Sequence, residues 1–445
     1  MENIGEVLKR TTDTKAARIG IGAMESSHEV FNELFPGRKA VLVADTNTYE
    51  AAGRKVEKNL EDNGIAIEGK FVFDDPDLYA EWGYLTELED YLKTVDAIPV
   101  AVGSGVINDL CKLSSHHLGR KYMIVGTAAS MDGYTAYGAS ITYQGNKQTF
   151  DCPAPAGIIF DPEVAALAPK ELAASGYADL LAKIPAGADW MLADAAGEEK
   201  LDKYAFGLVQ DRIREALRDP DAILAGNVQA TGHLADGLIM SGFAMQAINS
   251  SRPASGTEHQ FSHFWDMEGL CINGKHVSHG FKVAIGTMVS TACLEYLLKQ
   301  DIQNIDIDAC VNAWPSWEKM EEYIRQIFKG KPGHLERGLT ESRGKYIDAH
   351  QLRKELERIA AAWPQLKQRI STQIIPLWKI EDSLRRVGAP YRPEMIGVSR
   401  EHLRDTFRCI PFMRNRYTNI DLIYRCHLMG KVEKHLFGKG GIWEV

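Results

Sequence analysis

Apolar residues in the first third of the chain come in short runs that end in small or acidic residues. Such runs occupy residues 38–45, 96–105 and 121–130, and polar stretches with helical spacing lie between them at 48–64 and 106–119. Short buried strands that alternate with helices are typical of βαβ units in a parallel sheet. Ligands of such sheets bind at the carboxyl ends of the strands. We therefore predict a nucleotide-binding unit whose site lies where these runs end.

Helical periodicity dominates the chain after Pro169. The predicted helices lie at 169–194, 201–219, 231–250, 282–300, 351–370 and 417–430. Before them, two further short strands flank a Pro-rich loop at 151–157. A chain of 445 residues is too long for one ordinary hydrophobic core. We predict an α/β Rossmann-like domain at 1–165 and an all-α domain at 166–445, with a cleft between them.

The composition, with 45% hydrophobic and 25% charged residues, is that of a soluble globular protein. The formal net charge of −9 disfavours nucleic acid as a partner, although a local cationic pocket could still bind a small anion. The apolar runs are broken well before a membrane span of roughly 20 residues. Residues 1–15 lack the apolar core of a signal peptide. The seven cysteines include no C-x-x-C pair and fit reduced thiols. We expect a cytoplasmic protein with no membrane partner.

The glycine-rich segment 103-GSGVIND-109 follows a predicted strand and opens a predicted helix. Gly103 and Gly105 allow a tight turn and a close approach of the backbone to a pyrophosphate, which the helix N-terminus favours. The full dinucleotide fingerprint has a third glycine where this chain has Asn108. An ordinary turn between strand and helix is therefore the alternative interpretation.

Two other strand ends are suited to the same cofactor. The segment 127-TAASMDG-133 offers small residues and hydroxyl groups. Asp45 ends the first run, where an acidic residue commonly binds the ribose hydroxyls of the adenosine. A helix cap is the alternative role for Asp45, and a ribose role would favour NADH over NADPH.

A carboxylate and several histidines in the second half of the chain form a candidate metal site. Asp179 lies near the start of a predicted helix, and His279 lies just before another. His259 and His263 are four residues apart, which places them on one helical face. Such ligands suit Zn²⁺, Ni²⁺ or Fe²⁺ and leave positions open for an alcohol whose pKa the ion lowers. Spacing alone leaves open which histidines bind, and the further candidates are His276, His116 and His117.

Taken together and in this order, several segments resemble the sn-glycerol-1-phosphate dehydrogenase family. These segments are GSGVIND, TAASMDG, GYADLLAK, ADW, SSRPASGTEHQFSH and HGFKVAIGT. The family belongs to the iron-containing alcohol dehydrogenase and dehydroquinate synthase-like superfamily. The resemblance covers about residues 18 to 300 and returns at 413–424. It implies an enzyme that interconverts dihydroxyacetone phosphate and sn-glycerol 1-phosphate with NAD or NADP. It also implies that the enzyme is a homodimer.

The resemblance also assigns site residues. The metal ligands that it implies are Asp179, His259 and His279, with Zn²⁺ or Ni²⁺, and after these Fe²⁺, as the ion. Asp132, Asp179 and His263 are the implied substrate-contacting and catalytic residues. The implied cofactor-binding residues, added to Asp45, are Gly103, Ser104, Gly105, Val106, Ile107, Thr127, Ala128, Ala129 and Ser130.

The chain departs from the family pattern in two places. Ala136 stands where a serine is common, so that either one hydrogen bond to the cofactor is missing or Thr135 supplies the hydroxyl. Residues 300–412 do not align with the shorter archaeal-type members and could cover the cleft or contact a second subunit. For the substrate phosphate, Arg252 is the first candidate and Lys183 the second, although both could be ordinary charges at helix ends.

The implied reaction transfers a hydride between C2 of the substrate and C4 of the nicotinamide. His263 would relay a proton, because histidine titrates near neutral pH, and Asp132 would orient the terminal hydroxyl. One alternative is a dehydrogenase of a polyol or alcohol without phosphate. A carbon–oxygen lyase like dehydroquinate synthase is a second, disfavoured by the few cations around the motifs. A third is a protein that binds nucleotide without turnover.

Overall fold

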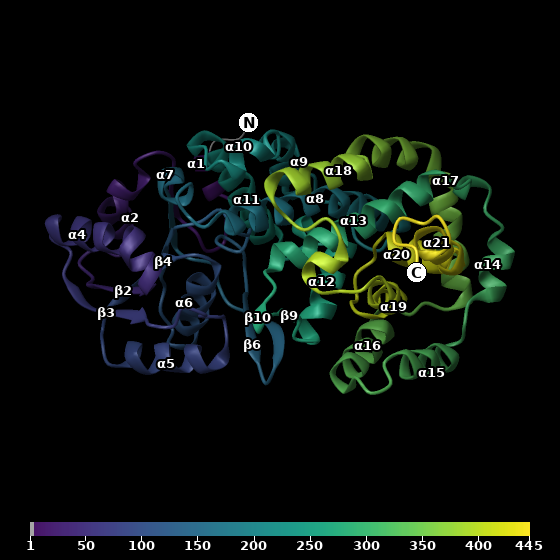
Figure 1. The fold of residues 1–445 in the computed structure, drawn as a ribbon, viewed down its shortest axis with the longest axis horizontal. Helices are drawn as coiled ribbons and strands as arrows, with labels where there is room; N and C mark the ends of the chain where they lie inside the picture. Colours follow the sequence, from purple (N-terminus) through teal and green to yellow (C-terminus); the bar gives the residue numbers. More distant parts are fainter. Residues whose placement is uncertain (1–3) are drawn as a thin grey trace. The chain divides into compact units, whose positions relative to one another are not determined.

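The computed structural model describes residues 4–445, which form two compact units (Figure 1). The first unit contains the residues up to Leu180, Gly207–Ser251 and Arg386–Gly388. The second contains Leu181–Phe206, Arg252–Arg385 and Ala389–Val445. The border falls inside one continuous helix, α8 (Lys170–Ala196). The assignment of nucleotide binding to 1–165 and of metal and substrate binding to 166–445 stays a prediction.

The first unit is built on a parallel sheet with the strand order β1-β8-β5-β4-β2-β3. Its strands are β1 (Ala16–Ile19), β2 (Ala40–Asp45), β3 (Ile67–Phe73), β4 (Ile98–Gly103), β5 (Met123–Gly126) and β8 (Gly157–Phe160). Every residue of β4, β5 and β8 is buried, because helices cover both faces of an α/β sheet. The predicted parallel sheet is confirmed.

The direction in which the chain crosses the sheet reverses between β2 and β4. The chain runs from β2 to its outer neighbour β3, and from β4 to its neighbour β5 on the other side. Val43 of β2 pairs with Ala101 of β4, so the terminal residues Asp45 and Gly103, each two positions further on, reach the same level of the carboxyl edge. A reversal of this kind opens the crevice in which such sheets bind nucleotides.

Helices cover the two faces of the sheet. On one face lie α2 (Ser27–Leu34) and α4 (Arg54–Asp62), whose apolar residues form one buried cluster with β2 and β4. Figure 1 shows α5 (Trp82–Lys93) and α6 (Gly105–His117) on the opposite side. The remaining elements of this unit include the hairpin β6 (Ala139–Tyr143) and β7 (Asn146–Phe150), and α7 (Pro162–Ala165), α10 (Pro220–Leu224) and α11 (Val228–Ile248).

The second unit is mainly helical, as the periodicity predicts. Its first part contains α12 (Thr257–Met267), the short hairpin β9 (Cys271–Ile272) and β10 (Lys275–His276), and α13 (His279–Leu298). Among the described helices, α13 is the one long and apolar enough to span a membrane, and 78% of its most apolar window is buried within the protein. The remaining main helices are α14 (Ile307–Ala313), α15 (Trp317–Ile327), α16 (Pro332–Lys345), α17 (Ala349–Gln373), α18 (Leu377–Val387), α19 (Arg400–Cys409), α20 (Asn419–Arg425) and α21 (Met429–Phe437).

Candidate active site

The predicted metal ligands Asp179, His259 and His279 come together in the structure. One ligand atom from each lies within 4.8 Å of the others. Asp179 is fully buried and His259 is 6% exposed, which suits a shielded ion with few water ligands. We expected Asp179 to lie near the start of a helix. It lies instead nine residues after the first residue of α8, because no residue between Lys170 and Asp179 interrupts the helix. A carboxylate and two imidazoles at this spacing fit a divalent transition-metal ion with small adjustments of the side chains.

Each of the two histidine rings makes a hydrogen bond through Nδ1 with a residue of α12. A hydrogen bond of 2.8 Å joins Glu258 Oε1 to His259 Nδ1, and one of 3.3 Å joins Ser262 Oγ to His279 Nδ1. Partners of this kind fix the orientation and tautomer of metal-binding histidines. Because the contacts with Glu258 and Ser262 are made by the Nδ1 atoms, we expect an ion to be bound by the Nε2 atoms. Spacing in the sequence gave no sign of either partner.

The helices α12 and α13, which carry the two histidines, pack at the closest range that backbones allow. A Cβ atom on Gly286 would lie 2.3 Å from the carbonyl oxygen of Glu258. Only glycine fits there, since real Cβ contacts are never that short. The glycine in the HGFKVAIGT segment therefore sets the distance between the helices that bear His259 and His279.

Asp132 lies against the metal-binding carboxylate. Its backbone N–H donates to Asp179 Oδ2 at 3.1 Å, and its own Oδ2 accepts a hydrogen bond from Ser241 Oγ at 2.9 Å. The structure thus brings together the two acidic residues for which the resemblance implied contact with substrate.

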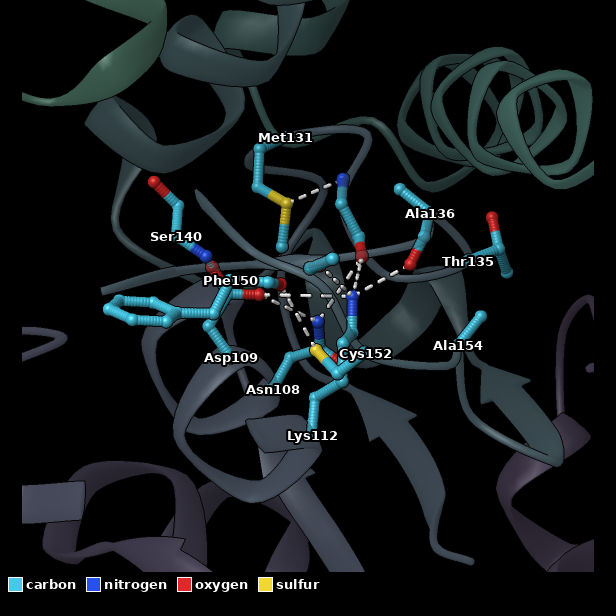
Figure 2. Close-up of polar contacts among 12 residues, drawn as sticks. Asn108, Asp109, Lys112, Met131, Thr135, Ala136, Ser140, Phe150, Cys152 and Ala154 are labelled. Atoms are coloured by element: carbon cyan, nitrogen blue, oxygen red, sulfur yellow. Dashed lines mark hydrogen bonds and ion pairs between the residues drawn. The ribbon is translucent and has the colours of Figure 1, made fainter. Parts of the chain in front are cut away.

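The loop that carries Asp132 is held by a buried lysine that the sequence analysis did not identify. Figure 2 shows Lys112 of α6 pointing into this loop. Lys112 Nζ donates to the carbonyl oxygens of Gly133, Ala136 and Gly138 at 2.9, 2.8 and 3.0 Å. The side chain is 1% exposed, so the three carbonyls replace its hydration. A lysine within the apolar helical stretch 106–113 was the one signal available in the sequence.

The residue that interrupts the dinucleotide fingerprint supports the same loop. Asn108 is fully buried, its Nδ2 donates to the carbonyl of Gly133 at 3.2 Å, and its Oδ1 accepts from Tyr122 Oη at 3.0 Å. A glycine at this position would lose both bonds. The expectation that Thr135 supplies a missing hydroxyl is wrong, because Thr135 is fully buried and its Oγ1 donates to the carbonyl of Ile239 at 2.8 Å.

The predicted cofactor-binding residues lie at the carboxyl edge of β4 and β5. α6 begins at Gly105, and Ser104 at its N-cap makes no side-chain capping bond. The residues Ser104, Gly105 and Val106 are partly exposed, whereas Gly103, Ile107 and the β5 end are buried. The buried members at the end of β5 are Thr127, Ala128, Ala129 and Ser130. The amides at the start of α6 are therefore the accessible part of the predicted phosphate-binding turn.

Asp45 does cap a helix, as its alternative interpretation suggested. Its Oδ1 accepts the backbone N–H of Thr48 at 2.9 Å, at the start of α3 (Thr46–Thr48). The side chain is partly exposed, and the capping bond occupies only one of its two oxygens. A ribose role for Asp45 is compatible with the cap and stays a prediction.

His263 stands one helical turn after His259, with 6.4 Å between the ring centroids. Burial lowers the pKa of His263 well below its usual value, and the positive charges of Arg414 and Arg337 lower it further. The imidazole is therefore neutral at neutral pH. This state suits an acceptor of a proton better than a donor.

The other candidate histidines are not part of the metal-binding group found in the described residues. His276 lies on β10, opposite Cys271, with 3.4 Å between Nδ1 and the Cys271 sulfur. His116 and His117 lie in the last turn of α6, where His117 Nδ1 is 2.6 Å from Glu89.

The two first candidates for phosphate binding are in the protein interior. Arg252 is fully buried, and its two Nη atoms donate to the carbonyls of Tyr417 and Asp189 at 2.9 and 2.7 Å. Lys183, on α8, is also fully buried. The expectation for Arg252 is wrong, because backbone carbonyls inside the protein occupy both of its Nη atoms, whereas a phosphate role for Lys183 stays a prediction.

Comparison with known proteins agrees with this fold. Residues 18–169 match the family of iron-containing alcohol dehydrogenases. A glycerol dehydrogenase from Schizosaccharomyces pombe shares the fold with a TM-score of 0.60 and 17% identity, over 95% of this chain and 91% of that one. An alcohol dehydrogenase from Oenococcus oeni has a TM-score of 0.57 and 16% identity, over 95% of this chain and 99% of that one. The predicted fold class, that of the iron-containing alcohol dehydrogenases, is confirmed.

The sequences of curated relatives narrow the class. The glycerol-1-phosphate dehydrogenase (NAD(P)+) of Geobacillus thermodenitrificans is 33% identical over 298 residues, which are 65% of this chain and 74% of that protein. The one of Methanosarcina mazei is 32% identical over 272 residues, 61% of this chain and 74% of that protein. The chain belongs to the glycerol-1-phosphate dehydrogenase family.

Proposed function

We propose that this protein is a metal-dependent oxidoreductase that interconverts dihydroxyacetone phosphate and sn-glycerol 1-phosphate with NADH or NADPH. The observation that carries the proposal is the donor group of Asp179, His259 and His279, whose ligand atoms lie within 4.8 Å of one another, with Asp132 bonded to Asp179. The names of the relatives at 33% and 32% identity support the same substrate pair.

The donor set would hold one divalent ion, which we propose to be Zn²⁺ or Ni²⁺, and after these Fe²⁺. When bound, such an ion polarises a carbonyl oxygen and stabilises the negative charge that develops on it during reduction. Glu258 and Ser262 keep the two imidazoles in the orientation that this requires.

The cofactor would bind along the carboxyl edge of β2 and β4. We propose that the amides at the start of α6 receive the pyrophosphate and that Asp45 receives a ribose hydroxyl, which favours NADH. The nicotinamide supplies or accepts the hydride, and the protein supplies position and charge. Asp45 and Gly103 end at one level of the sheet, so they border the same crevice.

Two residues of the chain would act on the substrate directly. Asp132, whose Oδ2 is oriented by Ser241, would accept a hydrogen bond from a substrate hydroxyl. His263, neutral because burial lowers its pKa, would accept the hydroxyl proton at a ring nitrogen in the direction of alcohol oxidation. In the direction of reduction it would return that proton.

The first experiment is a metal-reconstitution assay. The protein is stripped with a chelator, given Zn²⁺, Ni²⁺ or Fe²⁺, and assayed for NADH and NADPH oxidation with dihydroxyacetone phosphate. We expect turnover that metal restores and that His259→Ala abolishes, while the matched variant His276→Ala, on the exposed hairpin, keeps it. Absence of turnover with folded, metal-loaded protein would contradict the proposal, and glycerol and other polyols would then be assayed.

We further propose that the protein works in the cytoplasm as a homodimer. All seven cysteines are unpaired in the structure, which suits a reducing compartment. Light scattering after size-exclusion chromatography tests the dimer.

A further inference from the structure

Two arginines of the second unit bind Ser255, which lies four residues before His259, and a third binds the segment that carries them. Arg414 Nη1 donates to Ser255 Oγ and Arg416 Nη1 donates to the carbonyl of Ser255, both at 2.9 Å. Arg337, on α16, donates through Nε to the carbonyl of Met413 at 3.1 Å. We call Arg337, Arg414 and Arg416 the arginine cluster. It joins α16 and the segment before α20 to the start of α12.

The cluster is accessible to solvent, because Arg337, Arg414 and Arg416 are each partly exposed. Asn415, between two of them, is exposed. Its N–H donates to Glu341 Oε2 at 2.5 Å, and its side chain lies against Gly344.

Like charges are concentrated in this place. Burial lowers the pKa of Arg414 to about 10, and the charges of Arg337 and Arg252 contribute to the shift. Burial and the charge of Arg414 lower the pKa of Arg416 well below its usual value. Gathering partly buried guanidinium groups costs free energy, and a bound anion would offset that cost.

The carboxylates near the cluster have other partners. Glu341 lies 3.9 Å from Arg337 and accepts the N–H of Asn415. Glu258 is tied to His259 and accepts the N–H of Gly256 at 2.6 Å. Glu199 lies 3.4 Å from Arg252. Each of these three carboxylates therefore acts partly on a group outside the cluster.

The cluster also lies next to the proposed reaction centre. Ser255, which accepts hydrogen bonds from Arg414 and Arg416, is four residues before the ligand His259. The charges of Arg414 and Arg337 also contribute, after burial, to the lowered pKa of His263. His263 is itself one helical turn from His259.

We propose that Arg337, Arg414 and Arg416 form a subsite for the phosphate of a phosphate monoester and thereby select phosphorylated over unphosphorylated substrates. Guanidinium forks match phosphate oxygens in pairs, which is the geometry that such selection needs. The inference rests on the proposed function and adds the residues that recognise the substrate class.

The test compares the specificity constants for dihydroxyacetone phosphate and dihydroxyacetone. We expect the ratio of the two kcat/KM values to fall at least tenfold in Arg414→Gln and in Arg416→Gln. The matched control is Arg408→Gln, which removes an arginine paired with Glu433 on the surface of the same unit and should leave the ratio unchanged. Arg414→Lys keeps the positive charge but not the two parallel N–H donors of the guanidinium group, and we expect a smaller fall in this ratio. A wild-type ratio in Arg414→Gln, Arg416→Gln and Arg414→Lys would overturn the subsite.

A binding measurement separates this inference from the proposed function. Inorganic phosphate is titrated calorimetrically into the metal-loaded wild type and into Arg416→Gln, after thermal unfolding has shown that both are folded. If the wild type binds phosphate, the variant does not, and dihydroxyacetone phosphate is not turned over, the subsite stands and the proposed function fails. If dihydroxyacetone phosphate is turned over but phosphate binding and the ratio are the same in both proteins, the subsite fails alone.

Discussion

Glu258 and His259 are neighbours in the sequence and are joined by a hydrogen bond of 2.8 Å between Glu258 Oε1 and His259 Nδ1. Glu258 is fully buried, so the bond is shielded from water. We expect Glu258→Gln to lower the affinity for the metal about 10- to 100-fold, as loss of such partners usually does. Competition with a chromophoric chelator measures this affinity. Glu268→Gln, which removes a carboxylate paired with His402 at the end of the same helix, is the control. Equal affinities in all three proteins would contradict the role of Glu258.

Gly286→Ala should disturb both metal-binding histidines at once. The new Cβ would stand 2.3 Å from the carbonyl oxygen of Glu258, so α12 and α13 must move apart. We expect a loss of roughly 1–3 kcal/mol in the free energy of unfolding together with weaker metal binding. Chemical denaturation and metal titration check the two effects. Gly430→Ala, in α21 with open space around the new Cβ, should change neither. A Gly286→Ala protein as stable and as tight-binding as the wild type would show that the helices can separate without cost.

Lys112→Met should loosen the loop that carries Asp132. The substitution keeps an apolar stem of similar length but leaves the carbonyls of Gly133, Ala136 and Gly138 without their donor. We expect the free energy of unfolding to fall by roughly 1–3 kcal/mol and kcat to fall with it. Denaturation and steady-state kinetics measure these quantities, with Lys121→Met, at an exposed lysine just before β5, as control. Unchanged kcat in a destabilised Lys112→Met protein would limit the role of Lys112 to stability.

Glu355 should make the second unit less stable as the pH rises. Glu355 of α17 is 1% exposed and contacts Arg425 of α20, and burial raises its pKa from 4.5 to about 7 in spite of the arginine. The folded protein therefore keeps a proton that the unfolded chain releases. The resulting stabilisation is fully present below about pH 4.5 and is lost as the pH passes through about 7.

The size of this effect follows from the shift, which corresponds to roughly 3 kcal/mol. We expect the free energy of unfolding to fall between about pH 5 and pH 8 more steeply in the wild type than in Glu355→Gln. Urea titrations at both pH values give the two slopes. Parallel slopes would mean that Glu355 is ionised in the folded protein throughout this range.

The pattern of apolar residues was enough to predict the parallel sheet and most helices. It predicted a helix at 169–194, which corresponds to α8 (Lys170–Ala196) although Pro185 lies in its middle, but it could not show that this helix passes from one unit to the other. It also placed Asp179 near a helix start. Helix ends depend on tertiary packing as well as on local sequence, and a buried helix tolerates residues that an exposed one would not.

The candidate site was predictable only where the sequence carries a motif. The metal ligands lie in motifs, although the choice of His259 over His263 came from the resemblance, because both share one face of α12. The sequence could not reveal Lys112 as the partner of the Asp132 loop or Ser255 as the partner of Arg414, because these contacts join residues distant in the chain. Arg414, for example, is 159 positions from Ser255. Local patterns contain no information about such contacts.

The helix α6 connects the proposed cofactor site with the loop that carries Asp132. The amides proposed to receive the pyrophosphate are at Gly105, at the start of this helix. The ammonium group that binds the loop of Asp132 belongs to Lys112, about two turns further along the same helix. A dinucleotide bound at the start of α6 would therefore contact the same helix that holds the loop of Asp132. A substitution that displaces α6 would therefore affect the proposed phosphate-binding amides and the loop of Asp132 together.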